Sequence, residues 1–131
     1  MRILVAEDNL ENQEIIRRRL ERAGHVVTIA VNGVEAVEFA KRDQPDLILM
    51  DISMPIMSGI EATQVIRRTP EVKSIPIIAL TAHAMEGDAD KCLAVGCDAF
   101  STKPVRFGAL LELIEKVAAA RDRGEARAAR R

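Results

Sequence analysis

The sequence predicts an α/β protein with a doubly wound parallel sheet that is covered by helices on both faces. Three apolar runs, at residues 3–6, 47–50 and 77–80, are continuous rather than alternating, which is typical of strands buried on both sides. Segments with helical periodicity lie between the strands, and strand and helix alternate five times. Because consecutive units of this kind connect by right-handed crossovers, the alternation predicts a parallel sheet.

The first two units carry signals for the ends of their helices. Asn9 can cap the helix after the first strand, and Gly24 can end it. Residues 26–31 form a more polar run, which we interpret as an edge strand. Asn32 with Glu35 three residues later has the spacing of a helix cap and its reciprocal acid, with Asn in place of the usual Ser or Thr. A helix is therefore expected after each of these strands.

Prolines and apolar periodicity delimit the later units. Pro45 and Pro76 precede the third and fourth strands, where a missing N–H costs little. Gly59 follows a turn after the third strand and fits a loop that passes close to a phosphate and then starts a helix. The fifth strand is expected at 99–102. The last helix carries apolar residues at i, i+3, i+4 and i+7, namely Leu110, Leu113, Ile114 and Val117.

The chain of 131 residues is long enough for one compact domain, which we expect at residues 1–118. Residues 119–131 are rich in Arg and lack an apolar stripe, so they are expected to extend the last helix or to be disordered. No apolar stretch approaches the ~20 residues that a membrane span needs. We therefore expect a cytoplasmic protein without a membrane partner.

The composition argues against several kinds of site. The 19 Lys and Arg against 20 Asp and Glu give no overall bias toward nucleic acid or anionic membranes, and 2% aromatic residues leave little for base stacking. Cys92 and Cys97 have no His or further Cys at a spacing that would complete a zinc site. We interpret them as buried free thiols, with redox sensing as the alternative.

Polar side chains that phosphoryl chemistry could use stand at the ends of the apolar runs. They are Glu7, Asp8, Asp51, Thr81 and Lys103. The carboxyl ends of parallel strands open on one edge of the sheet, so these side chains should converge there. Three crowded carboxylates need a cation, and hard oxygen ligands favour Mg²⁺, with Mn²⁺ as the alternative. A phosphoryl group on Asp51 would then be held by the hydroxyl of Thr81 and the ammonium of Lys103.

Pro104 directly follows Lys103 and could form a cis peptide bond that aims the lysine inward. The sequence leaves the isomer of this bond open, because an X–Pro bond is trans by default. Pro104 is thus a candidate cis-proline beside the predicted site.

Four motifs in order resemble the signature of response-regulator receiver domains from two-component phosphorelays. They are Glu7-Asp8, the segment DISMPIMSG at 51–59, Thr81-Ala82 and Lys103-Pro104, and the resemblance spans about residues 2–118. It implies a flavodoxin-like (βα)5 fold with strand order 2-1-3-4-5. Two positions depart from the commoner pattern: the first acid of the acidic pair is Glu7 rather than Asp, and the aromatic residue three positions before the lysine is Phe100, which lacks a hydroxyl.

The resemblance also implies a role for each site residue. Asp51 would be the phosphoacceptor, and Mg²⁺ would be bound directly by Asp8, Asp51 and the backbone carbonyl of Ser53. Glu7 would act on the metal mainly through a coordinated water. The protein would then switch when Thr81 moves toward the phosphate and Phe100 turns inward.

The partners that the resemblance implies are proteins. A histidine kinase or histidine phosphotransfer protein would donate the phosphoryl group, and an effector or kinase would bind an output face formed by the last two helices and the fifth strand. The protein would be no enzyme beyond catalysing its own phosphorylation and dephosphorylation, would bind no nucleic acid directly, and would be a monomer or weak dimer. Residues 80–88 and 96–100 look especially like stand-alone regulators of bacterial cell-cycle relays and receivers of hybrid kinases.

Three alternatives remain beside a stand-alone regulator, which the initiating Met favours. The chain could be a receiver excised from a hybrid histidine kinase. It could be a phosphatase with an aspartate nucleophile, but such enzymes usually carry a second acid two residues after the nucleophile, where this chain has Ser53. A nucleotide- or flavin-binding module would need a Gly-rich loop after the first strand, where this chain has Glu-Asp-Asn-Leu.

Overall fold

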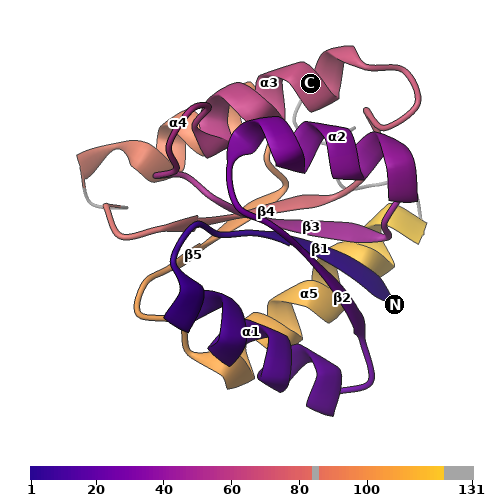
Figure 1. Ribbon diagram of the computed structural model, residues 1–131, viewed down its shortest axis with the longest axis vertical. Helices are drawn as coiled ribbons and strands as arrows, with labels where there is room; N and C mark the ends of the chain where they lie inside the picture. Colours follow the sequence, from indigo (N-terminus) through magenta and orange to yellow (C-terminus); the bar gives the residue numbers. More distant parts are fainter. Residues whose placement is uncertain (84–85, 123–131) are drawn as a thin grey trace.

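Five parallel strands form the central layer of the protein in a computed structural model, which describes residues 1–83 and 86–122 (Figure 1). The strands lie in the order β2-β1-β3-β4-β5. The predicted α/β fold and the implied strand order are both confirmed. The strand bounds are β1 Arg2–Ala6, β2 Val26–Ala30, β3 Leu47–Asp51, β4 Ile77–Thr81 and β5 Ala99–Thr102.

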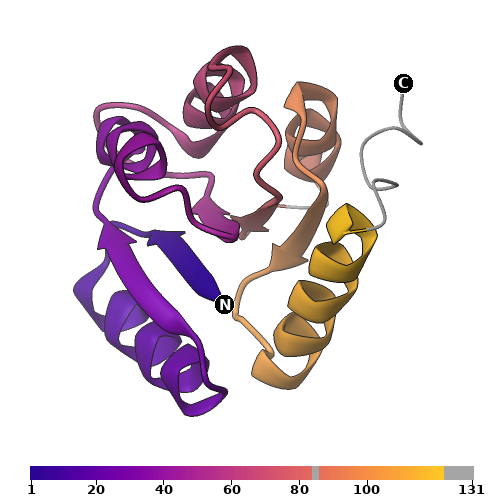
Figure 2. The ribbon, with the colours of Figure 1, turned by 90° about the vertical axis from the view of Figure 1, so that its right-hand side faces the viewer.

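Helices cover both faces of this sheet, as Figures 1 and 2 show. Two helices, α1 and α5, pack on one face, and α2, α3 and α4 pack on the other. Among the helices of the described residues, none combines the length and apolarity needed to span a bilayer. The helix bounds are α1 Leu10–Arg22, α2 Gly33–Asp43, α3 Gly59–Arg68, α4 Asp88–Val95 and α5 Phe107–Asp122.

The continuous apolar runs arise because each central strand supplies both layers of the core. In β3, Leu47 and Leu49 pack with α1 and α5, whereas Ile48 and Met50 pack with α2, α3 and α4. Successive strand side chains point to opposite faces, so a strand with two covered faces must be apolar at every position. The same alternation holds in β1 and β4.

Polar residues define the edge strand and the helix starts. The predicted edge strand is β2, which ends at Ala30 rather than at residue 31. Asn9 caps α1, and Asn32 caps α2 by accepting a hydrogen bond from the Glu35 N–H at 2.8 Å. The Glu35 carboxylate accepts from the N–H of Val31, one residue before the cap, so the predicted reciprocal bond is displaced. This displacement leaves the cap of α2 itself in place.

The last helix extends further than the predicted domain boundary, because α5 continues to Asp122. The predicted Arg-rich tail at 119–131 is therefore helical over its first four residues, and 123–131 lie outside the described residues.

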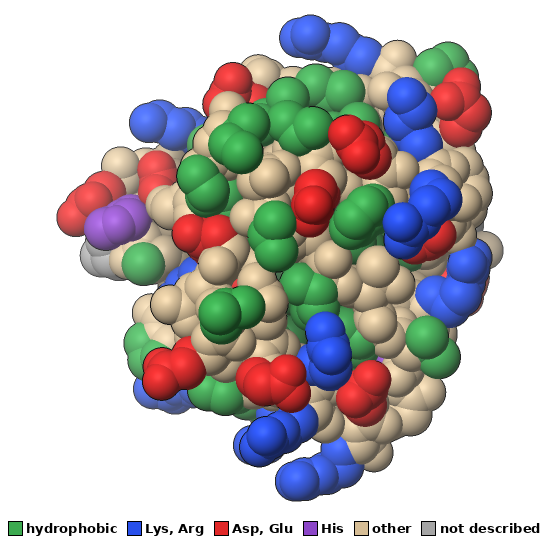
Figure 3. Space-filling view, in the orientation of Figure 1, with side chains coloured by type: hydrophobic (Ala, Val, Ile, Leu, Met, Phe, Trp, Pro, Cys, Tyr) green, Lys and Arg blue, Asp and Glu red, His purple; other side chains and the backbone are tan. Residues whose placement is uncertain are grey.

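Acidic and basic side chains are interspersed with apolar ones on the face shown in Figure 3. On this face, charge is not segregated into a patch of one sign.

The two cysteines are buried free thiols, as predicted. A hydrogen bond with Cys92 and burial raise the pKa of the Cys97 thiol. A thiol that stays protonated at neutral pH is a poor nucleophile. The structure therefore supports a packing role for Cys97.

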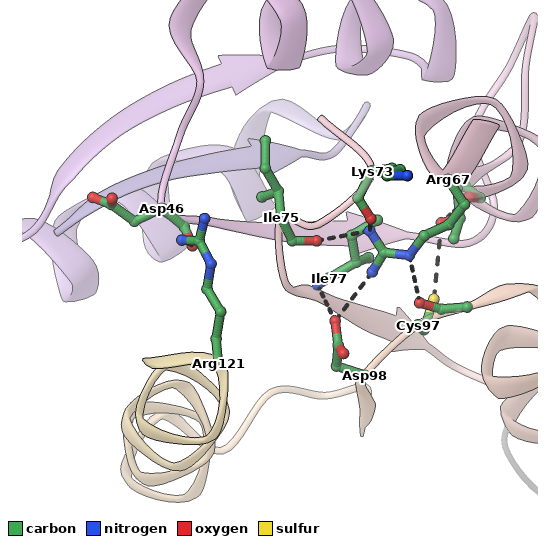
Figure 4. A network of polar contacts seen from close by, with 11 residues as sticks. Asp46, Arg67, Lys73, Ile75, Ile77, Cys97, Asp98 and Arg121 are labelled. Carbon is green, nitrogen blue, oxygen red and sulfur yellow. Dashed lines mark hydrogen bonds and ion pairs between the residues drawn. The ribbon is translucent and has the colours of Figure 1, made fainter. Parts of the chain in front are cut away.

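A buried polar network ties α3 to the amino ends of β4 and β5 (Figure 4). The Arg67 guanidinium lies 3.1 Å from Asp98, and it also donates hydrogen bonds to the carbonyls of Ile75 and Gly96. The same Asp98 oxygen accepts the Ile77 N–H at 2.8 Å. One ion pair thus joins three segments of the chain.

Candidate functional site

The residues that the sequence predicts to converge stand at the carboxyl ends of neighbouring strands. Carboxylate oxygens of Glu7, Asp8 and Asp51 all lie within 4.8 Å of one another. Glu7 and Asp51 are buried and Asp8 is exposed, so the acidic cluster opens to solvent on one side. Strands β1 and β3 are neighbours in the sheet, which explains why acids more than forty residues apart meet.

Lys103 lies inside this acidic cluster. Its Nζ is 3.1 Å from Glu7 Oε1 and 2.9 Å from Asp51 Oδ2. Burial alone would lower the pKa of Lys103, but the hydrogen bonds and charges of Asp51 and Glu7 outweigh burial and raise that pKa. The ammonium is therefore charged at neutral pH, and it contacts two of the three carboxylates and offsets one unit of their negative charge. The Lys103–Pro104 peptide bond, whose isomer the sequence left open, is cis.

The loop after β3 returns tightly toward Asp51. The Ser53 N–H donates to Asp51 Oδ1 at 3.1 Å, and the Gly59 N–H donates to the Ile52 carbonyl at 3.0 Å. Ser58 then caps α3 in a capping box with Glu61, which the sequence reasoning missed although its Ser-x-x-Glu spacing is the usual signal. These bonds set the position of Asp51 relative to the start of α3.

Replacing Gly59 with Ala is expected to destabilise the fold by about 2–3 kcal/mol, the cost of overpacking a tight site. A Cβ at this position would meet the backbone carbonyl of Asp51, and backbone cannot yield as a flexible side chain would. Urea denaturation of the variant measures the loss.

Gly108→Ala in α5 is the matched control, because a Cβ there has nothing within 4 Å. It should stabilise by roughly 0.5–1 kcal/mol through the lower entropy of the unfolded chain. Equal stabilities for the Gly59 and Gly108 variants would contradict this role of Gly59.

Thr81 and Phe100 occupy different environments. Thr81 is buried at the end of β4, and its Oγ1 accepts a hydrogen bond from the His83 N–H at 3.0 Å. Phe100 is 38% exposed on β5, in register with Ala79 rather than with the strand end that carries Thr81. The structure thus places Thr81 at the site edge and leaves Phe100 turned outward.

A cavity of about 510 Å³ adjoins the acidic cluster. Its polar lining is formed by Glu7, Asn12 and Lys103. Its apolar lining includes Ile15 and Phe107. The Arg19 guanidinium stacks on the Phe107 ring at 4.8 Å, which fixes one wall of the cavity. The mouth of the site therefore offers an apolar surface beside its charged groups.

A buried glutamine that the sequence reasoning missed contacts the site. Gln13 of α1 donates a hydrogen bond to the backbone carbonyl of Glu7 at 2.7 Å. Its position on the apolar face of α1, three residues before Ile16 and seven before Leu20, was a usable signal, because a polar residue there needs a buried partner.

Comparison with known proteins shows which family this chain resembles and over how much of its length. The family model for the response regulator receiver domain matches residues 3–115. The polar-differentiation response regulator DivK of Brucella anthropi is 38% identical over 113 residues, which cover 86% of this chain and 92% of DivK. Hybrid signal transduction histidine kinase I of Dictyostelium discoideum is 47% identical over 120 residues, which cover 86% of this chain but 7% of that kinase.

Solved structures share the fold, and one of those described next holds a magnesium ion while the other holds a partner protein. The receiver domain of sensor histidine kinase PA1611 from Pseudomonas aeruginosa, with a magnesium ion in its active site cleft, matches with a TM-score of 0.85 and 37% identity over 90% of this chain and 97% of that one. The Saccharomyces cerevisiae receiver domain of Ssk1, crystallised with the histidine phosphotransfer protein Ypd1, matches with a TM-score of 0.85 and 34% identity over 92% of this chain and 90% of that one. With the family model spanning most of its length, this chain belongs to the response regulator receiver domain family.

Proposed function

We propose that this protein accepts a phosphoryl group on Asp51 from a histidine kinase or a histidine phosphotransfer protein, and that phosphorylation changes which protein partner it binds. The observation that carries the proposal is the convergence of three carboxylates within 4.8 Å, with the Lys103 ammonium between two of them. That donor set suits both a hard cation and a transferring phosphoryl group.

The acidic cluster fits Mg²⁺, with Mn²⁺ as the alternative. Asp8 and Asp51 would bind the ion directly together with the Ser53 backbone carbonyl, and Glu7 would act mainly through a water. When bound, the ion would neutralise charge that builds up on the transferring phosphoryl group. The magnesium in the related Pseudomonas receiver supports this assignment.

The transfer step uses the carboxylate of Asp51 as nucleophile. One Asp51 oxygen forms a bond to phosphorus while the bond from phosphorus to the donor's imidazole nitrogen breaks, and the imidazole keeps the electron pair. The Asp51 oxygen then no longer pairs with Lys103, which leaves the ammonium to hold a phosphoryl oxygen. The buried Thr81 hydroxyl would hold another phosphoryl oxygen, at the cost of its bond with the His83 N–H.

The switch would follow from this rearrangement. Thr81 would move toward the phosphate, and Phe100, now 38% exposed, would turn inward and alter the face formed by α4, β5 and α5. An effector or kinase binding that face would then distinguish the two states. DivK, a response regulator matched over 92% of its length, supports a stand-alone role, and the hybrid kinase match keeps an excised receiver as the alternative.

The histidine phosphotransfer donor is supported by the Ypd1 complex of the related yeast receiver. The rival function, a phosphatase that turns over small phosphoesters, has less support. The residue two positions after Asp51 is Ser53, whose exposed side chain offers no general acid.

Incubation with acetyl phosphate and Mg²⁺ tests the proposed function. We expect one phosphoryl group per chain by intact mass, stable to acid, labile to base and absent when EDTA replaces Mg²⁺. Many turnovers of a phosphoester would favour the phosphatase instead. A chain that stays unmodified with acetyl phosphate and also with a phosphorylated histidine phosphotransfer protein would contradict the proposal.

Lys103→Met is expected to tighten Mg²⁺ binding roughly tenfold, because the ion no longer competes with an ammonium for the same carboxylates. It should also slow phosphate uptake, since a phosphoryl oxygen loses its cationic partner. An NMR titration of the unphosphorylated protein with Mg²⁺ measures the affinity. Lys116→Met on the exposed side of α5 is the control and should leave the affinity unchanged. Weaker Mg²⁺ binding by the Lys103 variant would count against competition.

A further inference from the structure

We propose that Gln13 is a positioning residue for the metal site, which holds the peptide unit between Glu7 and Asp8 in the orientation that Mg²⁺ binding needs. This inference rests on the proposed function, because it assigns a role toward the same cation. Gln13 belongs to α1 and is not one of the residues proposed to hold the ion or the phosphoryl group.

Gln13 makes a buried hydrogen bond to the backbone at the end of β1. Gln13 is 8% exposed, and its Nε2 donates to the Glu7 carbonyl oxygen at 2.7 Å in a buried setting. A carbonyl can only accept, so the amide must present its NH₂ group to Glu7. The Gln13 backbone N–H donates to the Asn9 carbonyl at 3.0 Å, which makes the donor part of the first turn of α1.

This hydrogen bond controls the orientation of the peptide unit between Glu7 and Asp8. The Glu7 carbonyl, the Asp8 N–H and the Asp8 Cα lie in one peptide plane, so holding the carbonyl oxygen sets the direction in which Asp8 leaves the strand. On the other side of Glu7, its N–H donates to the Ala30 carbonyl at 2.9 Å. The backbone of Glu7 is thus held at both ends, by β2 and by α1.

The positions of the Glu7 and Asp8 carboxylates depend on this bond unequally. The Glu7 carboxylate has partners of its own, the Asn9 N–H and the Lys103 ammonium. The Asp8 carboxylate is exposed and, among residues 1–83 and 86–122, has no hydrogen-bond or ion-pair partner. Its place in the acidic cluster is therefore set by the backbone, and the Gln13 bond is the side-chain contact that holds that backbone.

Packing alone does not account for a glutamine here. Position 13 is on the buried face of α1 with Ile16 and Leu20, where an apolar side chain of the same length would fill the space without a polar group to satisfy. Groups that orient metal ligands by hydrogen bonding, without contacting the metal, commonly lower metal affinity when they are removed. Gln13 stands in that relation to the turn carrying Glu7 and Asp8.

The test uses two variants with side chains of similar length that both remove the NH₂ donor, Gln13→Met and Gln13→Glu. The first is neutral and the second adds a negative charge. NMR titration of the unphosphorylated protein gives the Mg²⁺ dissociation constant, and the carbonyl ¹³C resonance of Glu7 reports the hydrogen bond directly. We expect both variants to shift that resonance and to weaken Mg²⁺ binding about tenfold, at the lower end of the usual effect of such partners. Gln64→Met in α3, which is partly exposed, is the matched control and should change neither.

The outcomes separate positioning from simpler explanations. A purely electrostatic effect would leave Gln13→Met at the wild-type affinity and tighten binding in Gln13→Glu, and this result would overturn the inference. A Mg²⁺ dissociation constant within twofold of wild type in both variants would also overturn it. In phosphorylation with acetyl phosphate, both variants should need a higher Mg²⁺ concentration for half-maximal rate but keep the wild-type rate at saturating Mg²⁺. General destabilisation does not produce this combination. Failure of the proposed function is distinct, because the wild type itself would then stay unmodified with acetyl phosphate and with a phosphorylated histidine phosphotransfer protein.

Discussion

We expect Asp51→Asn to take up no phosphate from acetyl phosphate or from a phosphorylated histidine phosphotransfer protein, even at saturating Mg²⁺. The carboxamide has nearly the shape of the carboxylate but lacks the anionic oxygen that attacks phosphorus. It also removes one negative charge from the acidic cluster, so Mg²⁺ should bind more weakly as well. Intact mass after incubation measures the uptake, and a second measurement with Mg²⁺ omitted gives the background.

Asp90→Asn is the control for this result, because Asp90 is an exposed acid on α4 outside the acidic cluster. It should be phosphorylated as the wild type is. The Asp51 variant is expected to stay folded, because Lys103 keeps its contact with Glu7 at 3.1 Å when the charge of Asp51 is removed. Full phosphorylation of folded Asp51→Asn would show that another residue is the acceptor, and the function proposed for this site would be wrong.

Asp98→Ala is expected to lower the free energy of unfolding by about 3–5 kcal/mol, the usual cost of removing one partner from a buried ion pair. The Asp98 side chain is 1% exposed and that of Arg67 is 13% exposed, so solvent cannot replace the lost carboxylate. The variant also leaves the Ile77 N–H at the start of β4 without its acceptor. Urea denaturation measures the change, and Figure 4 shows the contacts that are lost.

Two comparisons identify the cause. Asp43→Ala removes an exposed ion pair with Arg42 and should have little effect on stability, because water solvates both partners. Asp98→Asn keeps an oxygen that can accept the Ile77 N–H, so it should be less destabilised than Asp98→Ala. Equal stabilities for the Asp98 and Asp43 variants would refute the importance of the buried network.

The contrast between Asp51 and Asp98 shows where sequence reasoning succeeds. Asp51 follows a continuous apolar run, and the end of such a run predicts a place on the functional edge of the sheet before any contact is known. Asp98 stands beside a less regular strand, and its importance depends on Arg67 and Ile77, which come from other segments. No local pattern indicates a pairing across such separations.

The same reasoning applies to the details of the site. The convergence of Glu7, Asp8 and Lys103 follows from the order of apolar runs and helices, but the isomer of the Lys103–Pro104 bond does not, because it depends on packing around the proline. The contact of Gln13 was not predicted from the sequence either, although the sequence shows a polar residue on the apolar face of this helix. Its partner is a backbone carbonyl, which every residue carries and no sequence motif marks.

Hydrophobic periodicity was enough to specify five strands, five helices and the edge of the sheet where the acids meet. Burial on one or both faces of an element requires apolar residues at regular intervals along the chain. The residue motifs were enough to indicate the family. Three-dimensional packing decided which acids are buried, which carboxylates the lysine contacts and which side chains hold the turns in place. These properties depend on distances between segments far apart in sequence, and hydrogen bonds and ion pairs form or fail within a fraction of an ångström.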